Sequence, residues 1–169
     1  HFPAGQPVDL AAIASQWQAV GLCSEHFAVV HSGLSKTPLL VVEKLDQASL
    51  QDASDETRTD QFYADPRLPR TQRAELGDYK GSGFDRGHMA PAANQPTATA
   101  MGQSFALSNM VPQDRVNNQK IWAKIESDVR KYVRALEQAM IDTCAAYGVA
   151  TTRLEGHRSE EHTSELQSL

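Results

Sequence analysis

The chain of 169 residues is the size of one domain, and a hydrophobic content of 40% suffices for a single core. No run of about 18 apolar residues occurs, which excludes a predicted membrane-spanning helix, and no basic and apolar leader opens the sequence. The formal net charge of −5 argues against a generally basic protein, although four glutamates fall within residues 155–169 and arginines are spread through the middle of the chain.

The N-terminal half predicts a short helix followed by a β-hairpin. Residues 8–20 suit a short helix or an irregular lead-in. Residues 27–32 and 38–45 are apolar, β-branched runs separated by a short glycine-containing segment, which indicates two largely buried strands paired as a hairpin. Residues 46–80 are polar and have few apolar anchors, so we expect mostly a long loop, of a length that is usually functional or mobile.

The C-terminal half predicts a glycine-rich turn, a strand and one long helix. Residues 81–88 hold three glycines, which let the backbone turn sharply or approach a ligand closely. Residues 91–103 are polar and suit one short helical turn, and residues 104–111 suit a strand. From about 118 to 140, apolar residues recur at the three- and four-residue steps of an amphipathic helix, for which Asn117 is the predicted N-cap.

The two cysteines give little information about function. Cys23 and Cys144 lie far apart in the sequence and have no metal-ligand spacing. We expect two buried free thiols, with a disulfide as the alternative if the protein is exported.

Hydrolysis of a phosphodiester bond needs an activated water, a cation and a grip on the phosphate. Histidine is the natural base near neutral pH, and arginine presents two donors to phosphate oxygens. His88 and Arg86 stand two residues apart in Asp85-Arg86-Gly87-His88, so an extended segment would point both to one face. Taken alone, this pair favours an ordinary structural or exposed histidine.

The long helix carries a second candidate set at four-residue steps. Asn118, Trp122, Glu126 and Arg130 drift by about 40° per step, so Asn118 and Glu126 can face one cleft. The alternative is a solvated face with a Glu126–Arg130 ion pair, which the ladder alone favours. Only the two candidate sets together indicate a site.

Together, Asp85-Arg-Gly-His-Met-Ala-Pro-Ala, Phe105-Ala-Leu-Ser-Asn-Met-Val-Pro-Gln and the helix ladder closely resemble the DNA/RNA non-specific endonuclease family from about Leu22 to Arg130. The resemblance implies an α+β fold of the ββα-metal (His-Me finger) type, with a mixed, mainly antiparallel sheet and a long helix across it. It also implies endonucleolytic cleavage of DNA and RNA with 5′-phosphate and 3′-hydroxyl products. Contacts to phosphate and sugar rather than base edges would explain little sequence preference.

The same resemblance assigns the reaction centre. His88 matches the general base that takes a proton from the attacking water. Asn118 matches the one direct protein ligand of a hydrated Mg²⁺, with Mn²⁺ as an alternative ion. Glu126 matches a residue that holds metal-bound waters. Arg86 matches a catalytic position that contacts phosphate, and Asp85, which opens the motif, is expected to be structural.

Other matches belong to substrate binding. Arg58 matches a family position that contacts phosphate, and Arg130 occupies a family position near the site. Asn109 and Gln113 match polar positions that orient His88 or line the cleft. The expected partners are DNA and RNA and no membrane, and a homodimer is left open. The full-length protein is expected to be secreted or periplasmic, with a leader outside this chain, and a cytoplasmic location is the alternative.

The C-terminal part departs from the family pattern, because no apolar strand follows the long helix. The sequence therefore predicts a C-terminally truncated family member with exposed apolar surface. Residues 158–168 have no hydrophobic period and resemble a translated sequencing adapter. The expected organisation is a lead-in, a partial nuclease domain, a non-family or frame-shifted segment and a foreign or disordered tail, at residues 1–21, 22–140, 141–157 and 158–169.

Two rival functions remain. One is a non-catalytic nucleic-acid-binding fragment of such a nuclease. The other is an HNH-like nuclease that binds its metal mainly through histidines. The long helix carries Asn118 and no second histidine, which argues against the HNH-like alternative.

Overall fold

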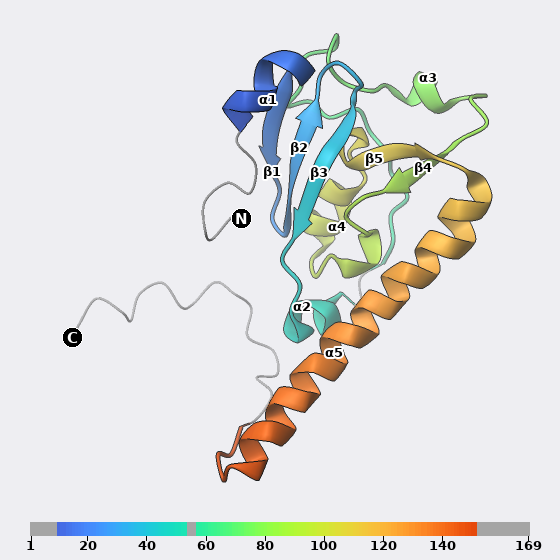
Figure 1. Ribbon diagram of the computed structural model, residues 1–169. Coiled ribbons are helices and arrows are strands. Elements are labelled where there is room, and N and C mark those ends of the chain that lie inside the picture. Colours follow the sequence, from blue (N-terminus) through green and yellow to red (C-terminus); the bar gives the residue numbers. More distant parts are fainter. Residues whose placement is uncertain (1–9, 54–56, 152–169) are drawn as a thin grey trace.

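Two antiparallel sheets form the centre of the fold, in a computed structural model that describes residues 10–53 and 57–151. The first sheet has the order β1 (Ala19–Cys23), β2 (Phe27–Ser32), β3 (Thr37–Glu43). The second pairs β4 (Asp85–His88) with β5 (Met110–Gln113). Figure 1 shows this pair to the right of β3, with β5 leading into the long helix.

The helices are short except for the last one. Figure 1 shows α1 beside the first sheet and α5 running past α2, with its C-terminal half extending beyond the rest of the fold. None of the helices in the described part of the chain is long and apolar enough to cross a membrane. The helices are α1 (Leu10–Trp17), α2 (Gln47–Asp52), α3 (Leu76–Tyr79), α4 (Ala98–Ser104) and α5 (Ala123–Ala146), and three shorter helical segments are Ala92–Asn94, Leu107–Asn109 and Asn117–Trp122.

The predicted hairpin is confirmed, and its first strand becomes the centre of a three-stranded sheet. Every residue of β2 is buried, because β2 has a strand on each side. The third strand, β1, was not predicted. It occupies the end of the expected lead-in, and most of its side chains are exposed, so its hydrophobic pattern is weak.

The predicted strand at residues 104–111 is wrong in its position. The helix α4 ends at Ser104, a helical turn occupies Leu107–Asn109, and the strand β5 begins only at Met110. Pro112 lies within β5 although it has no N–H to donate. The pairing allows this because β5 has a partner on one side only, so an edge position needs no donor there.

The long helix begins earlier than predicted, and Asn117 is not its N-cap. The side chain of Asp114 accepts hydrogen bonds from the backbone N–H groups of Val116 (2.9 Å) and Asn117 (3.0 Å) and therefore caps the helix. Residues Asn117–Trp122 are wound as a π-helix, a form that is frequent at functional sites. The helix then continues as α5 to Ala146, past the predicted end, and is followed by Gly148 with a φ of +76°.

The apolar stripe of the long helix is largely exposed. No side chain of α5 is fully buried, and Leu136 and Met140 are 50% and 63% exposed. This stripe does not test the exposed apolar surface expected from the sequence, because that expectation concerned a face of the sheet. The stripe is the sequence signature that predicted an amphipathic helix, but the described residues supply no partner surface that buries it.

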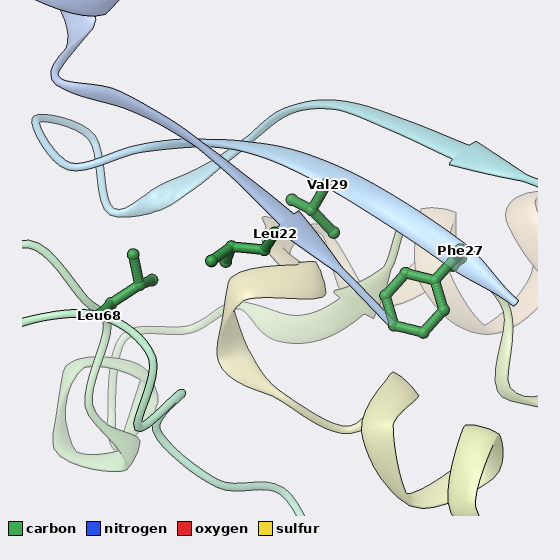
Figure 2. Close-up of a cluster of buried hydrophobic side chains, with 5 residues drawn as sticks. Leu22, Phe27, Val29 and Leu68 are labelled. Atoms are coloured by element: carbon green, nitrogen blue, oxygen red, sulfur yellow. The ribbon is translucent and has the colours of Figure 1, made fainter. Parts of the chain in front are cut away.

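The core beneath the first sheet takes one of its members from the loop between α2 and α3. Figure 2 shows Leu68 of this loop near Leu22 of β1, with Val29 and Phe27 of β2 in the same cluster. Phe62 of the same loop packs on two further clusters, beside Met110 and beside Phe105. The loop that the sequence presented as polar and poorly anchored is therefore part of the core.

A buried carboxylate fastens this loop. The side chain of Asp65 is 1% exposed and forms an ion pair with Arg67, with 2.6 Å between Oδ2 and Nη2. Ser108 donates to the same oxygen at 2.5 Å, and Arg67 Nη1 donates to the carbonyl oxygen of Cys23 at 2.7 Å. Burial opposes ionisation of Asp65, but the hydrogen bonds from Arg67 and Ser108 outweigh it, so its pKa lies below the ordinary value.

The cysteines differ from expectation. Both are free thiols, but Cys23 is exposed and Cys144 is only partly buried. Cys23 lies on an edge strand, and Cys144 lies on the part of α5 that extends from the fold, so neither position offers a core. The expectations for residues 1–9 and for the tail at 158–169 lie outside the described residues.

Replacement of Asp65 tests this fastening. Asp65→Ala should lower the free energy of unfolding by about 2–4 kcal/mol, because Arg67 and Ser108 lose a buried partner. Chemical denaturation at pH 7 measures the change. Asp128→Ala removes an exposed carboxylate paired with two lysines and serves as the control, with a much smaller loss expected. Equal losses in the two variants would contradict a structural role for Asp65.

Candidate active site

His88 ends β4 and is buried, with 8% of its surface exposed. Its ring packs edge-on against Phe105 at a centroid distance of 4.9 Å and lies 5.7 Å from the ring of Phe62. Its Nε2 atom is buried and has no hydrogen-bond partner among the described residues. Burial and the nearby Arg58 guanidinium lower the pKa of His88 to about 4. The imidazole is therefore neutral at pH 7 and has a nitrogen free to accept a proton.

Asn109 holds the backbone that follows His88. Its side-chain amide donates to the carbonyl oxygens of Ala90 (3.0 Å) and Ser104 (2.9 Å), and its Oδ1 accepts from the N–H of Ala90 (2.9 Å). Asn109 is also 0% exposed. Its assignment to substrate contact is therefore corrected: a fully buried and fully hydrogen-bonded amide cannot touch a substrate, and it acts on the segment that carries His88.

The side chain of Gln113 packs over Gly87. A Cβ atom at this position would clash with Gln113, which comes from the opposite strand β5 and would have to shift. The Oε1 atom of Gln113 is buried and has no hydrogen-bond partner in the described residues. The glycine of the motif thus makes room for Gln113, and contact of Gln113 with substrate stays a prediction.

Asp85 joins the beginning of β4 to the beginning of the long helix. Its carboxylate accepts hydrogen bonds from Nδ2 of Asn118 (3.2 Å) and Nε2 of Gln119 (2.8 Å), and the guanidinium of Arg115 lies 3.5 Å away. The hydrogen bond from Asn118 is the main cause that keeps the pKa of Asp85 below its ordinary value. Because Nδ2 is committed to Asp85, the amide oxygen of Asn118 is the atom available to a ligand.

Asn118 borders a polar cavity of about 440 Å³, which we call the motif cavity. Arg86 and Arg58 line this cavity too, and Arg86 is held with its guanidinium carbon 4.0 Å from the centre of the Phe62 ring. The other lining residues include Tyr79, Lys80, Phe84 and Asp85. The fold therefore places two predicted phosphate contacts beside the predicted metal ligand.

Arg58 connects the parts of the site. It comes from the loop between α2 and α3, its guanidinium lies 5.3 Å from the centre of the Phe105 ring, and it forms an ion pair with Asp60 at 2.6 Å. Its charge lowers the pKa values of both His88 and Glu126. His88 and Glu126 are 38 positions apart in the sequence, yet both interact electrostatically with Arg58. This supports the prediction that the motif around His88 and the ladder on the long helix form one site.

Glu126 and Arg130 lie one helical turn apart near a second carboxylate that the sequence did not reveal. Burial raises the pKa of Glu126, against the opposing charges of Arg130 and Arg58. Arg130 Nη1 donates to Oδ1 of Asn94 at 3.4 Å, and Nδ2 of Asn94 donates to Glu43 at 3.3 Å. Glu43, at the end of β3, therefore supports Arg130 through Asn94.

Glu43 has the most strongly shifted carboxyl group of this region. Burial, together with the neighbouring charge of Glu126, raises its pKa to about 7 against hydrogen bonds from Asn94 and Gln95. Gln95 donates to Glu43 at 3.1 Å and is itself 1% exposed. The only sequence signal for Glu43 was a charged residue within an otherwise apolar strand, and the partners that make it unusual are about 50 residues away.

The donor set fits a hydrated magnesium ion. Among the described residues, no group of three or more His, Cys, Asp or Glu side chains is placed to hold a metal. The amide oxygen of Asn118 borders an open cavity, and Glu126 lies two helical turns further along the helix. This arrangement suits an ion that keeps most of its waters. Calcium or zinc would require more protein ligands than these residues provide.

The model for DNA/RNA non-specific endonuclease matches residues 12–157. The chain belongs to this family. It is 35% identical over 120 residues to human mitochondrial nuclease EXOG, covering 70% of this chain and 32% of that protein. It is also 35% identical over 120 residues to human mitochondrial endonuclease G, with coverage of 70% and 40%. The chain thus spans about a third of the length of these curated family members.

The fold agrees with the family. The EndoG structure from the EndoG/EndoGI complex aligns with a TM-score of 0.61 and 27% sequence identity, over 68% of this chain and 48% of that chain. The α+β arrangement of antiparallel sheets and a long helix is the ββα-metal nuclease fold, as the resemblance implied.

The expected location is wrong. Nuclease 1 of Schizosaccharomyces pombe is 36% identical over 115 residues, which cover 67% of this chain and 36% of that protein. Like human EXOG and human endonuclease G, it is named a mitochondrial nuclease. These names contradict the expectation of a secreted or periplasmic protein.

Glu43→Gln tests the unusual carboxyl group by its effect on stability. The pKa of Glu43 is raised in the folded state, so the protonated carboxyl group stabilises the fold. This stabilisation is complete below pH 4.5, the pKa of the unfolded state, and is lost as the pH rises through about 7. Glutamine imitates the protonated form. The variant should therefore gain about 1–3 kcal/mol relative to the wild type between pH 5 and pH 8, measured by denaturation in EDTA.

Glu25→Gln is the control for loss of a surface carboxylate, because Glu25 is exposed and glutamine can still accept the hydrogen bond from Thr97. Its stability at pH 7 should differ little from that of the wild type. A stability difference between Glu43→Gln and the wild type that stays constant with pH would rule out the raised pKa of Glu43.

Proposed function

We propose that this chain is a Mg²⁺-dependent endonuclease that hydrolyses phosphodiester bonds of DNA and RNA with little sequence preference. The observation that carries the proposal is the neutral, buried His88 with an unpartnered Nε2 beside the Arg58 guanidinium. The motif cavity with Arg86 and Asn118 supports it, as does membership of the endonuclease family.

His88 acts as the general base. Its imidazole is neutral over the working pH range, so it accepts a proton from the water that attacks the phosphorus atom. A bound phosphate brings negative charge close to the ring and raises the pKa of His88, which strengthens the base when substrate is present. The rings of Phe105 and Phe62 fix the orientation of the imidazole, and Asn109 fixes the backbone that carries it.

Asn118 would hold a hydrated Mg²⁺ through its amide oxygen, with Mn²⁺ as the alternative, and Glu126 would accept hydrogen bonds from the waters of the ion. When bound, the ion supplies positive charge for the phosphate and the leaving oxygen. Asp85 contributes by fixing the amide of Asn118, so its role is to position the ligand.

Arginines provide the contacts to the substrate. Arg58 and Arg86 line the motif cavity, and Arg130 is held near Glu126 by Asn94. Guanidinium groups bind phosphate oxygens in a two-pronged geometry and do not distinguish bases. The proposal therefore includes weak sequence preference and inhibition by salt, since binding to phosphates releases counterions.

A non-catalytic nucleic-acid-binding role is the second candidate. The exposed apolar stripe of α5 favours it, because the helix that carries Asn118 and Glu126 has few neighbours to fix its position. In that case the arginines would still bind nucleic acid, but the metal geometry would not be maintained. The two candidates share the fold and differ in turnover.

Plasmid nicking separates them. Wild-type protein with Mg²⁺ should convert supercoiled plasmid to nicked and linear forms, and EDTA should abolish the conversion. His88→Ala should lower the rate by about 10²- to 10⁴-fold, the usual contribution of a positioned base. His26→Ala, in the turn between β1 and β2, is the matched control and should leave the rate unchanged. Wild-type cleavage rates in His88→Ala would refute His88 as the base.

A further inference from the structure

A second cavity of about 470 Å³ lies between α2, the segment around Ala92 and Ala93, and the middle of α5. We call it the helix cavity. It shares Arg58 with the motif cavity. Of its lining residues, the sequence analysis singled out Arg58 and Arg130 but not Lys131 or Arg134, and the cavity itself is formed by three separate parts of the chain.

The composition of the helix cavity is that of an anion site over an apolar floor. Among the described residues, the floor is made by small or apolar side chains, and the charged lining consists of cations. The floor residues are Leu50, Ala53, Ala92, Ala93 and Met101; the cations are Arg58, Arg130, Lys131 and Arg134, and Ser127 completes the lining.

Carboxylates of the described residues neutralise some, but not all, of the positive charges facing this cavity. Lys131 is paired with Asp128 at 3.1 Å, and Arg58 with Asp60 at 2.6 Å. Arg130 lies near the carboxyl of Glu126. Arg134 is different, because no carboxylate of the described residues lies within ion-pair distance of it. An exposed guanidinium that borders a cavity without a protein counterion is suited to an anion from solution.

The spacing of the arginines on α5 indicates the direction in which a bound strand would run. Arg130 and Arg134 are four residues apart, so they point to the same side of α5 and are separated by about 6 Å along the helix axis. A strand whose phosphate is held by Arg58 and Arg130 would present its next phosphate further along the same helix. Arg134 is the cation located there.

We propose that the helix cavity is a nucleic-acid subsite that binds the backbone phosphate next to the scissile one, with Arg134 as the main contact and Lys131 beside it. The inference rests on the proposed nuclease function and extends it beyond the reaction centre. The sugar of that nucleotide packs on the apolar floor. The floor offers no side-chain amide for reading a base edge, so the subsite adds affinity without adding sequence preference.

Binding measurements without turnover test the subsite directly. The probe is a fluorescein-labelled 20-nucleotide single strand, titrated with the 169-residue protein in EDTA at NaCl concentrations from 50 to 300 mM. Arg134→Gln should weaken binding about 3- to 10-fold at the lowest salt and should reduce the log–log salt slope by about 0.7, the value for one lost phosphate contact on a single strand. Arg134→Lys should keep most of the slope because it keeps the charge.

Arg70→Gln is the matched control, since Arg70 is 86% exposed and lines neither cavity. It should leave affinity and salt slope unchanged. Arg134 is exposed, so its variants should keep the wild-type unfolding midpoint. If Arg134→Gln and Arg70→Gln give the same affinity and slope, the subsite is refuted.

Kinetics separate failure of the subsite from failure of the proposed function. With Mg²⁺, Arg134→Gln should raise the KM for the oligonucleotide more than the KM for a nucleoside p-nitrophenyl phosphodiester, which has no neighbouring phosphate. Equal changes for both substrates would overturn the subsite and leave the nuclease intact. If the wild-type protein hydrolyses neither substrate, the proposed function fails, and the binding titration alone decides whether the subsite exists.

Discussion

The buried carboxylate of Asp65 is the interaction on which the site most depends. Through Arg67 it ties the loop between α2 and α3 to the backbone of β1, and through Ser108 it ties the same loop to the turn before β5. That loop brings Arg58 and Phe62 to the site. Ser108 is followed directly by Asn109, the residue that fixes the backbone after His88, so one carboxylate connects the cationic loop with the strand that carries His88.

The two cavities are lined mainly by positive charges, although the molecule carries a negative net charge. The chain has a formal charge of −5, yet its two cavities are lined by five arginines and lysines around Arg58. Burial shifts the three titratable groups of the centre toward their neutral forms: it lowers the pKa of His88 and raises those of Glu43 and Glu126. In the proposed function, a bound cation would favour the ionised forms of the carboxylates, and a bound phosphate would raise the pKa of His88.

The elements that follow from a pattern of neighbouring residues could be predicted from the sequence. The features that depend on contacts between distant residues could not. The β2–β3 hairpin and the long helix follow from β-branched runs and from a helical period, and both are confirmed. The strand β1 has a weak pattern because it is an exposed edge. The helix cap moved from Asn117 to Asp114, since the hydrogen bonds depend on where the strand β5 ends. The role of Asn109 changed for the same kind of reason, because its burial depends on packing that no neighbouring residue determines.

The sequence by itself determined the family, the motif around His88, and the helical spacing that puts Asn118, Glu126 and Arg130 on one side of α5. These features are local, since a tetrapeptide and a four-residue step define them. Only the tertiary structure decided that Arg58 stands between His88 and Glu126, that Glu43 supports Arg130, and that Arg134 borders a second cationic cavity. Each of these joins residues at least 30 positions apart, through ion pairs, hydrogen bonds and burial that exist only once the sheets, the loop and the helix have packed together.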